Sequence, residues 1–525
     1  MSRISKFIKM IVLTIFCCSF VASPTLAKDS EVTVITKSPP MHYNGALTAS
    51  TQTLGISTQL FASPLRYDMD WNPMPYLAKS WEFSEDQKTL ILNLVDNAVF
   101  HDGKPVTAED VIFSIEVIKK NHPFQTMFVA ISNMEALDQH TVKINLSYPY
   151  PSILLAMSPA LCPIIPKHVY GDGQDIKTHP ANINVIGSGP YKMVEAKAGE
   201  YVILEKFENY FINDRPHLDR VIFRFIKDPS SRMLSMTKGE AQLFPLVENT
   251  HNVQRMSKDP HLAVTSLGYD GISGMNLLEF NTLKKPFSDV TVRKAINHAI
   301  DRNFIINKLH SGLSKVATGP IIPSSPFYEA NVPQYEYDLN KANKMLDEAG
   351  YKPDKNGIRF SVTLDYEPGL PEQQKLVAEY LKGQLKKIGI EIKLNTSPDW
   401  GTWAERVSNW DHDMTLSILF NWGDPVIGTH RSYLSTNIRK GVPYANMSNY
   451  KNARVDELLN AAAQEMDMEK RKQLYSEFQK IVMNDLPIIQ LNLIPYNTVY
   501  NKKLDNVVTS IWGPLSPMDE LIINK

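Results

Sequence analysis

Cysteine is nearly absent from this chain of 525 residues. Two of its three cysteines, Cys17 and Cys18, lie near the N-terminus, and only Cys162 remains in the rest of the chain. If the N-terminal segment is removed, as we infer below, no intramolecular disulfide is possible. Cys162 stands between Leu161 and Pro163, and we interpret it as a small buried apolar residue rather than a reactive thiol.

The chain also lacks an excess of charge of either sign, since 55 basic and 56 acidic residues give a formal net charge of −1. There are no long basic runs, so we predict no nucleic-acid partner. Beyond the N-terminal segment, no apolar run is long enough to span a membrane. Protein and small-molecule ligands are the partners left open by this composition.

Common catalytic motifs are missing in complete form, including His-Glu-x-x-His, Cys-x-x-Cys, the phosphate loop and Gly-x-Ser-x-Gly. Gly271-Ile272-Ser273-Gly274 is followed by Met275, where a final glycine is needed. Ser235-Met236-Thr237-Lys238 fits Ser-x-x-Lys without its companion motifs, so a periplasmic serine hydrolase is only an outsider. The 13 histidines are scattered. We therefore predict no enzyme, no metal site and no cofactor.

The first residues have the pattern of a secretory signal peptide. Arg3, Lys6 and Lys9 are followed by an apolar stretch over 10–21 and by small residues ending at Ala27. The apolar stretch is short for a membrane span, although an uncleaved anchor is the alternative. We expect cleavage after residue 27 and an exported protein.

Strand and helix patterns alternate along the remaining chain, as in α/β folds. A chain of this length exceeds one hydrophobic core, so two or three lobes are expected. The 358–394 unit predicts two parallel strands joined by a helix. Predicted strands are 31–36, 141–146, 201–206, 221–226, 358–364 and 390–394, and predicted helices are 289–310, 372–388, 453–466 and 469–484.

The segment 77–114 is the most ordered pattern in the sequence. Leu90, Leu92 and Leu94 share one side of a predicted strand. His101-Asp102-Gly103 follows as a turn, and Thr107 begins a helix with Asp110 in the fourth place of a capping box. These patterns predict a strand, a turn and a helix, and no chemistry.

The run FHDGKPVTAEDV in this segment resembles the one that marks periplasmic solute-binding proteins of the oligopeptide- and dipeptide-binding type, extracellular family 5. Further matching pieces occur in order along the chain. They are Gly187–Tyr191, Phe280–Thr282, Pro286–Asp289, Val292–Ile296, Ala299–Arg302, Tyr337–Leu339, Leu346–Tyr351, Trp400, Asp424-Pro425, Arg471, Leu474 and Tyr475. These proteins are the receptors of ABC importers.

The resemblance implies an α/β fold of three lobes, with a ligand cleft between lobes joined by a two-crossing hinge. Ligand binding then biases an opening and closing equilibrium. The implied boundaries are 1–27 for the signal peptide, 28–62, 189–275 and 496–525 for lobe I, 63–188 for an inserted lobe II, and 276–495 for lobe III.

The implied function is the capture of di- or oligopeptides in the periplasm and their delivery to a heterodimeric inner-membrane permease. We expect a monomer. The alternative is the same role for a non-peptide solute such as an opine, a sugar conjugate, haem or a metal chelate.

Aromatic residues and one arginine are the first candidates for ligand contact. Trp400, with Trp403 beside it, resembles the segment that supplies an aromatic side chain to the family's peptide pocket. Arg431 is a candidate for a ligand carboxylate, because its guanidinium offers a fork of donors. Further aromatic candidates are Trp422, Tyr444 and Tyr496.

The segment from Asn421 to Pro425 departs from the family pattern. In peptide-binding members, an aspartate three residues before the acid-proline pair takes the ligand's α-ammonium group, and Asn421 stands there in this chain. An amide accepts hydrogen bonds but cannot neutralise a cation. Either Asp424 takes over this role, or the ligand lacks a free ammonium group.

Overall fold

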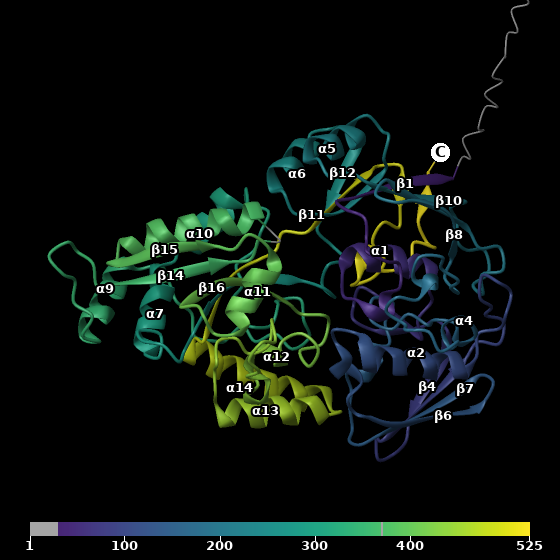
Figure 1. Ribbon diagram of the computed structural model, residues 1–525, viewed down its shortest axis with the longest axis horizontal. Helices are drawn as coiled ribbons and strands as arrows, with labels where there is room; N and C mark the ends of the chain where they lie inside the picture. The colour runs from purple at the N-terminus through teal and green to yellow at the C-terminus, as the bar shows by residue number, and fades with distance from the viewer. Residues whose placement is uncertain (1–29, 369–370, 525) are drawn as a thin grey trace, which may run out of the picture.

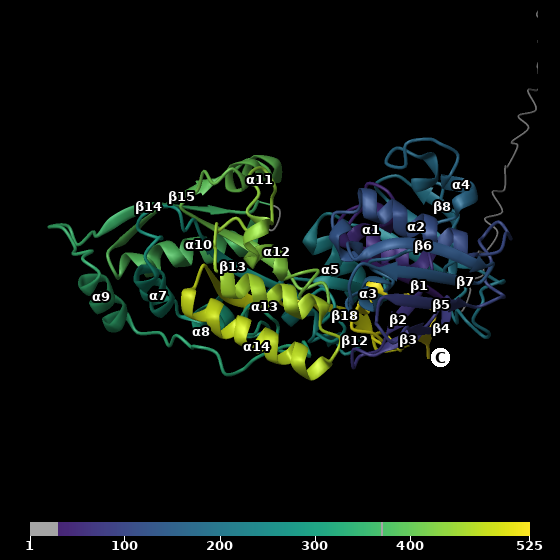
Figure 2. The same ribbon diagram turned by 90° about the horizontal axis from the view of Figure 1, so that it is seen from below.

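The structure, a computed structural model, describes residues 30–368 and 371–524. Its elements form two large parts that lie side by side, in the view of Figure 1 and in the view from below in Figure 2. Three main sheets organise these parts, with seven, five and four strands. The predicted signal peptide, residues 1–27, lies outside the described residues.

The seven-stranded sheet is built from the two ends and the middle of the chain. Its strand order is β12-β18-β11-β1-β10-β9-β8. The strands are β1 (Glu31–Thr36), β8 (Tyr191–Lys197), β9 (Tyr201–Lys206), β10 (Arg220–Phe225), β11 (Leu243–Val247), β12 (Leu262–Thr265) and β18 (Asn497–Asn501). The associated helices are α1 (Thr51–Leu60), α5 (Pro229–Thr237) and α6 (Thr250–Met256). The strands predicted near 31, 201 and 221 are therefore confirmed.

The four-stranded sheet contains the 77–114 segment. It consists of β4 (Ala78–Phe83), β5 (Thr89–Leu94), β6 (Ile131–Asp138) and β7 (Thr141–Leu146), with α2 (Ala108–Asn121) packed nearby. Leu90, Leu92 and Leu94 are buried, as the alternation predicts. The Asp110 carboxylate accepts hydrogen bonds from the backbone N–H and the hydroxyl of Thr107, at 2.9 and 2.7 Å. The predicted helix start at Thr107 is confirmed.

The five-stranded sheet has the order β15-β14-β16-β13-β17. Its strands are β13 (Gly274–Phe280), β14 (Phe360–Tyr366), β15 (Ile390–Thr396), β16 (Met414–Phe420) and β17 (Ile488–Leu493). Its helices include α7 (Val290–Ala299), α9 (Leu339–Glu348), α10 (Pro371–Lys386), α11 (Trp400–Ser408), α13 (Ala453–Gln464) and α14 (Met468–Asp485). Strands β14 and β15 are parallel, so the predicted crossover is confirmed.

The continuous helix predicted over 289–310 is wrong. Helix α7 ends at Ala299, and Ile300 is extended with ψ of 113°. The Asp301 carboxylate then accepts a hydrogen bond from Phe304 N at 3.0 Å and begins the short α8 (Arg302–Phe304). A π-helical turn follows at Ile305–Leu309. A capping aspartate inside the apolar pattern therefore divides this segment.

The remaining elements are short. Among the described residues, none of the helices is both long and apolar enough to cross a lipid bilayer. The short elements are α3 (Ile153–Ala156), α4 (Lys167–Tyr170), α12 (His430–Tyr433), β2 (Leu65–Tyr67), β3 (Pro73–Pro75), β19 (Leu504–Asp505), β20 (Ile522–Ile523) and 3₁₀ turns at Gly45–Leu47, Gln125–Phe128, Pro180–Asn182, Ser435–Asn437 and Gly513–Leu515.

The chain passes from the seven-stranded to the four-stranded sheet and back at two adjacent places. Gly189 N donates to the carbonyl of Leu60, at the end of α1, at 2.9 Å. A Cβ atom on Gly187 would lie 1.9 Å from the same carbonyl oxygen, and one on Gly189 would lie 2.4 Å from the carbonyl of Gln59. Close approach of two backbones therefore requires both glycines.

These two sheets share a single hydrophobic core, which includes Val32 and Phe223 from one sheet and Leu90 and Ile144 from the other. We name this part the double-sheet body. Most apolar residues of the five-stranded sheet and its helices form separate cores, and we name this part the single-sheet body.

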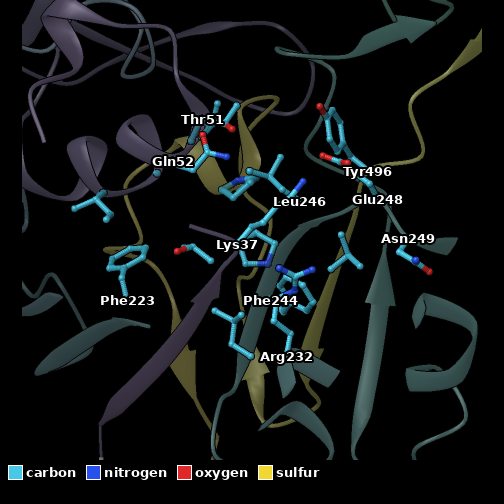
Figure 3. A pocket seen from close by; sticks show the side chains of 18 of the residues that line it. Lys37, Thr51, Gln52, Phe223, Arg232, Phe244, Leu246, Glu248, Asn249 and Tyr496 are labelled. Carbon is cyan, nitrogen blue, oxygen red and sulfur yellow. The ribbon is translucent and has the colours of Figure 1, made fainter. Parts of the chain in front are cut away.

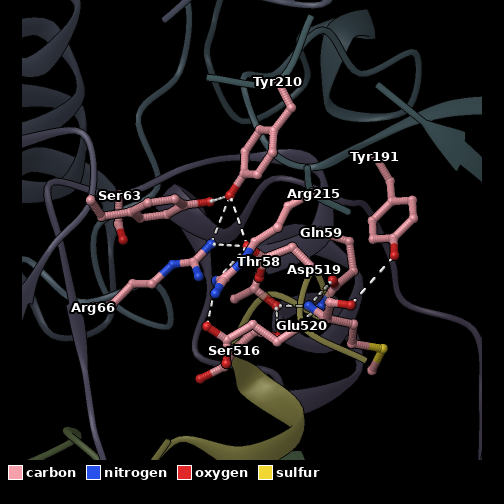
Figure 4. Close-up of polar contacts among 12 residues, drawn as sticks. Thr58, Gln59, Ser63, Arg66, Tyr191, Tyr210, Arg215, Ser516, Asp519 and Glu520 are labelled. Carbon is pink, nitrogen blue, oxygen red and sulfur yellow. Dashed lines mark hydrogen bonds and ion pairs between the residues drawn. The ribbon is translucent and has the colours of Figure 1, made fainter. Parts of the chain in front are cut away.

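Buried ion pairs tie the C-terminal segment to the double-sheet body (Figure 4). Arg66 on β2 donates to the Asp519 carboxylate at 3.0 Å and to the Tyr210 hydroxyl at 2.7 Å. Arg215 lies 3.5 Å from the same carboxylate, which is fully buried. The shared core and these ion pairs hold the double-sheet body together as one unit.

The two bodies are connected by two chain segments, which run over 266–273 and 494–496. Ile494 N donates to the carbonyl of Gly274 at 2.8 Å, and the rings of Tyr269 and Tyr496 lie 5.4 Å apart. Two short, adjacent crossings between separately packed bodies are the geometry of a hinge.

Candidate ligand-binding site

A cavity of about 270 Å³ lies in the double-sheet body beside the hinge (Figure 3). The carboxyl ends of β1 and β11 and the first turn of α1 form its walls. Lys37, Lys227, Arg232 and Glu248 are its charged residues, and Tyr496 is the one predicted site residue that lines it.

Tyr496 connects this cavity to the single-sheet body. Figure 3 shows its side chain next to Glu248. Burial raises the pKa of Tyr496, and the charges of Glu248, Tyr269 and Glu367 raise it further. Glu367 follows β14 in the single-sheet body. Tyr496, Glu248 and Glu367 therefore mark where the two bodies meet at the cavity.

A cluster of aromatic side chains lies on the single-sheet body. Asp399 caps α11 by accepting a hydrogen bond from Thr402 N at 2.8 Å, and the helix begins with Trp400. Trp400 is 44% exposed, and its indole N–H donates to the Tyr444 hydroxyl at 2.9 Å. Tyr444 has φ of 56°, in the left-handed region. A strained backbone at such a position is common where a side chain is held for binding.

Trp403 lies beneath this cluster. It is fully buried, its indole N–H donates to the Thr415 hydroxyl at 3.1 Å, and its ring lies 5.7 Å from that of Tyr444. Its satisfied N–H and complete burial identify it as packing support for Tyr444 in this conformation.

Arg431 lies between the cluster and the double-sheet body. Its guanidinium is 5.7 Å from the ring centre of Tyr444 and 5.8 Å from that of Phe124. Within residues 30–368 and 371–524 it has no ion pair, and its buried Nε atom has no hydrogen-bond partner. Burial lowers the pKa of Arg431 to about 10, against the influence of Tyr444 and Glu279. The side chain is therefore a cation without a direct counter-charge.

Glu279 is the buried acid whose charge acts on Arg431. Burial raises the pKa of Glu279 to about 7, while a hydrogen bond from the Ser417 hydroxyl and the charge of Arg431 lower it. Glu279 and Arg431 do not form an ion pair in the described part of the chain. Their charges interact electrostatically, without direct contact between the two side chains.

Glu367 is a functional candidate that the sequence analysis missed. It is 8% exposed and accepts a hydrogen bond from the Tyr444 hydroxyl on Oε1 at 2.9 Å. Its Oε2 atom is buried and has no hydrogen-bond partner among the described residues. Burial raises the pKa of Glu367. A lone glutamate after a strand carries no sequence signal that distinguishes it from a surface residue.

Trp422 and Asn421 connect the single-sheet body to the double-sheet body and to the hinge. Trp422 packs 4.9 Å from Phe124 and 6.3 Å from Trp512, and it belongs to the core of the double-sheet body. Asn421 donates to the carbonyl of Ser273 in the hinge from its backbone and side chain, at 3.1 and 3.3 Å. Trp422 thus packs into the core of the double-sheet body, and Asn421 fixes the end of β16 to the hinge.

Asp424 is engaged in a buried ion pair with Arg471 of α14. Two hydrogen bonds of 2.8 and 2.9 Å join both oxygens of the carboxylate to the guanidinium, and Val426 N donates to one of them. Burial alone raises the pKa of Asp424, but Arg471 and these hydrogen bonds hold it below its ordinary value. The carboxylate is therefore already neutralised, as in a structural ion pair.

The predicted residues thus divide by position. Trp400, Trp403, Tyr444, Arg431 and Trp422 form one chain of ring and cation contacts, with Phe124 joining the last two. Asn421 lies at the hinge, Tyr496 at the cavity and Asp424 in the ion pair. The sequence analysis also missed Phe124 and the cavity residues Lys37, Arg232 and Glu248, which lie far apart in the sequence.

No group of three or more potential metal-ligating side chains is found in the described residues. Cys162 is buried and free, and burial raises the pKa of its thiol. The charged and aromatic groups above are the candidate ligand contacts on which the proposals below are based.

Comparisons with known proteins identify the family and the fold. The family described as bacterial extracellular solute-binding proteins, family 5, middle region, matches residues 72–440. The probable D,D-dipeptide-binding periplasmic protein DdpA of Escherichia coli is 30% identical over 468 residues, which cover 85% of this chain and 83% of that protein.

Solved structures extend the comparison over almost the whole chain. The oligopeptide-binding protein AppA of Bacillus subtilis, in complex with a nonapeptide, has a TM-score of 0.78 and 26% identity, covering 94% of this chain and 99% of that one. NikZ of Campylobacter jejuni, in complex with Ni(L-His), has a TM-score of 0.77 and 26% identity, covering 93% and 96%. The chain therefore belongs to family 5 of the bacterial extracellular solute-binding proteins.

Proposed function

We propose that the protein captures peptides in the periplasm, as the substrate-binding component of an ABC importer, and delivers them to a heterodimeric inner-membrane permease. The observation that carries the peptide assignment is Arg431, a cation beside an aromatic wall for which the described side chains offer no direct counter-charge. A carboxylate at the end of a peptide supplies the missing charge, and the guanidinium fork suits its geometry.

The relatives support a peptide ligand. The Escherichia coli protein is named for D,D-dipeptides, and the Bacillus subtilis structure holds a nonapeptide. In such receptors, main-chain hydrogen bonds and end charges bind an extended ligand, while loose pockets accept varied side chains. The cavity beside Tyr496 has room for a side chain of this kind.

Contacts between the two bodies support binding by closure. Arg471 donates to the Ser152 hydroxyl at 3.0 Å, and the Trp71 indole N–H donates to the carbonyl of Ser324 at 3.1 Å. A Cβ on Gly423 would lie 2.4 Å from a methyl group of Leu155. We infer that these contacts belong to a closed state, which opens about the hinge to admit ligand.

The same proposal keeps the three predicted lobes. The adjacent crossings near residues 60 and 189, and those at 266–273 and 494–496, support boundaries at 62/63, 188/189, 275/276 and 495/496. We further propose a cleaved signal peptide over 1–27, a monomer, and no chemistry performed on the ligand.

A non-peptide solute is the second candidate, because Asn421 replaces the acid that binds ammonium in peptide-binding members. The relative that holds Ni(L-His) shows that this fold accepts such ligands. A ligand without a free ammonium group would leave no need for an acid at residue 421.

Isothermal titration with alanine peptides of two to five residues tests the proposal. We expect at least one peptide to bind the wild-type protein, and Arg431→Gln to weaken that binding by at least about 30-fold. The absence of binding by every peptide would contradict the peptide assignment. Native mass spectrometry of protein from a periplasmic extract would then identify the solute that it carries.

A further inference from the structure

Glu367 has the geometry of a carboxylate prepared for a cation. The Tyr444 hydroxyl donates a hydrogen bond to the Glu367 Oε1 atom at 2.9 Å. The backbone N–H of Glu367 donates to the Gln374 side chain, also at 2.9 Å. Its Oε2 atom is buried without a partner in the described part of the chain. A buried carboxylate oxygen without a hydrogen bond is costly and calls for an explanation, and a cation of the ligand would supply the missing partner.

The other acids near the site are already engaged or lie beside cations. Both oxygens of Asp424 bind Arg471. Glu279 accepts from Ser417 and lies in the field of Arg431. The charges of Lys37 and Arg232 both act on Glu248. Glu367 differs from these three, because within the described residues no cation pairs with it or lowers its pKa.

Arg431 and Glu367 are placed on opposite parts of the same tyrosine. Glu367 accepts from the Tyr444 hydroxyl, and Arg431 lies 5.7 Å from the centre of its ring. Along this path through Tyr444 the two charges are at most about 12 Å apart, so a ligand that bridges them is no longer than about three extended residues. This spacing suits a short ligand with a positive and a negative end.

We propose that Glu367 binds the ammonium group of the ligand while Arg431 binds its carboxylate, so that the protein selects peptides of two or three residues with free ends. The inference rests on the proposed peptide-binding function. It assigns the cation-binding role that Asn421 cannot perform to an acid on another strand end. Trp400, exposed beside Tyr444, forms the wall along which the peptide lies.

The inference also explains why both charges are only partly satisfied in the closed state without ligand. Each keeps one fixed contact, the Tyr444 hydroxyl for Glu367 and the Tyr444 ring for Arg431. A zwitterionic peptide that enters while the hinge is open supplies both missing partners when the hinge closes. The gain in contact is then largest in the closed state, which shifts the equilibrium toward it.

The test compares tri-alanine with N-acetyl-tri-alanine by isothermal titration, in the wild type and in Glu367→Gln. The substitution keeps an oxygen for Tyr444 and removes only the charge. We expect it to weaken tri-alanine binding by at least about 30-fold and to leave the weaker N-acetyl-tri-alanine binding within about threefold. Glu391→Gln is the matched control, because Glu391 on β15 also accepts a hydrogen bond from a hydroxyl group, that of Ser361 at 2.6 Å, but is exposed and lies outside the site. It should change tri-alanine affinity by less than about threefold.

Tyr444→Phe is the second variant, because it keeps the charge of Glu367 but removes the hydroxyl that holds it. We expect a loss of about three- to tenfold for tri-alanine and a smaller one for the acetylated peptide. Circular dichroism and thermal unfolding verify that each variant is folded.

These experiments distinguish a failure of the Glu367 assignment from a failure of the proposed peptide-binding function. If tri-alanine binds the wild type and Glu367→Gln equally, or if Glu391→Gln shows the large loss, the assignment of Glu367 is wrong and peptide binding stands. If no alanine peptide of two to five residues binds the wild type, the proposed function fails and the role of Glu367 fails with it. Equal binding of tri-alanine and penta-alanine would overturn the length selection.

Discussion

Two pairs of oppositely charged residues lie near the cleft and differ in one respect. In the Asp424–Arg471 pair, the two charges bind each other directly at 2.8 and 2.9 Å. In the Arg431–Glu367 pair, both charges contact Tyr444 but not each other. The first pair is complete without ligand, and we propose that a bound ligand completes the second.

We interpret the first pair as a structural ion pair and the second as part of the proposed binding site. A carboxylate in an interior costs free energy unless it is paired and hydrogen-bonded. Arg471 removes that cost for Asp424 and also reaches Ser152 across the cleft. For Arg431 and Glu367 the cost remains, and a ligand that removes it gains affinity. Substitutions should therefore change stability in the first pair and affinity in the second.

The largest effect is expected for Asp424→Asn. The substitution leaves the Arg471 guanidinium buried without its counter-charge, so the free energy of unfolding should fall by about 3–5 kcal/mol. Denaturant unfolding monitored by circular dichroism measures this. A variant with unchanged stability and abolished peptide binding would instead make Asp424 a ligand-binding residue.

The next effect is expected for Arg431→Met, and it should appear in affinity. Peptides with a free carboxylate should bind about 2–4 kcal/mol more weakly, while their C-terminal amides should bind the variant and the wild type equally. The free energy of unfolding should stay the same or rise, because the variant removes an uncompensated charge. Isothermal titration and denaturant unfolding measure the two quantities. A destabilisation equal to that of Asp424→Asn would remove the contrast between the pairs.

The pH dependence of stability sharpens the comparison through Glu279. Burial raises its pKa to about 7, above the value of about 4.3 expected in the unfolded chain. The folded state therefore binds the proton more tightly, and this contribution to stability is lost as pH rises from about 4.3 to 7.

Compared with Glu279→Gln, the wild type should lose about 1–3 kcal/mol of stability between pH 4.5 and pH 8. Denaturant unfolding of both proteins at several pH values measures the difference. A constant difference would show that Glu279 does not titrate in this range. In Arg431→Gln the transition should move to higher pH, because Arg431 is a cation that lowers this pKa.

The smallest effect is expected for Trp400→Ala. Its partly exposed ring contributes stacking and apolar contact, so tri-alanine affinity should fall by about three- to tenfold. Wild-type tryptophan fluorescence should change on binding, and this change should be smaller in the variant. Trp410→Ala serves as the control, because Trp410 lies beside Lys440, 5.9 Å from its ring centre, and not in the cluster of Trp400 and Tyr444. Equal losses in both variants would deny Trp400 a specific role.

Local patterns predicted much of the fold. Alternating leucines located β5, the Thr107–Asp110 cap located the start of α2, and the parallel β14–β15 unit followed from its strand-helix-strand pattern. The predicted helix over 289–310 failed because Asp301 accepts a hydrogen bond from Phe304 N and starts a new helix. The apolar periodicity on either side conceals that break.

The site was less predictable, because its properties depend on partners far apart in the sequence. Asp424 was predicted as a candidate for an ammonium group, and the sequence did not indicate that Arg471, 47 residues later, is its partner in this structure. Glu367 gained interest only from Tyr444, 77 residues later. Trp400, Arg431 and Tyr444 were identified by residue type and resemblance, and the structure brings them together.

A crystal structure of the protein with bound tri-alanine tests the central claim most directly. We predict the peptide ammonium within hydrogen-bond distance of Glu367 Oε2, the carboxylate on the Arg431 guanidinium, and the Asp424–Arg471 pair unchanged. A peptide whose ammonium lies on Asp424, with Arg471 displaced, would contradict the distinction between the complete and the incomplete pair.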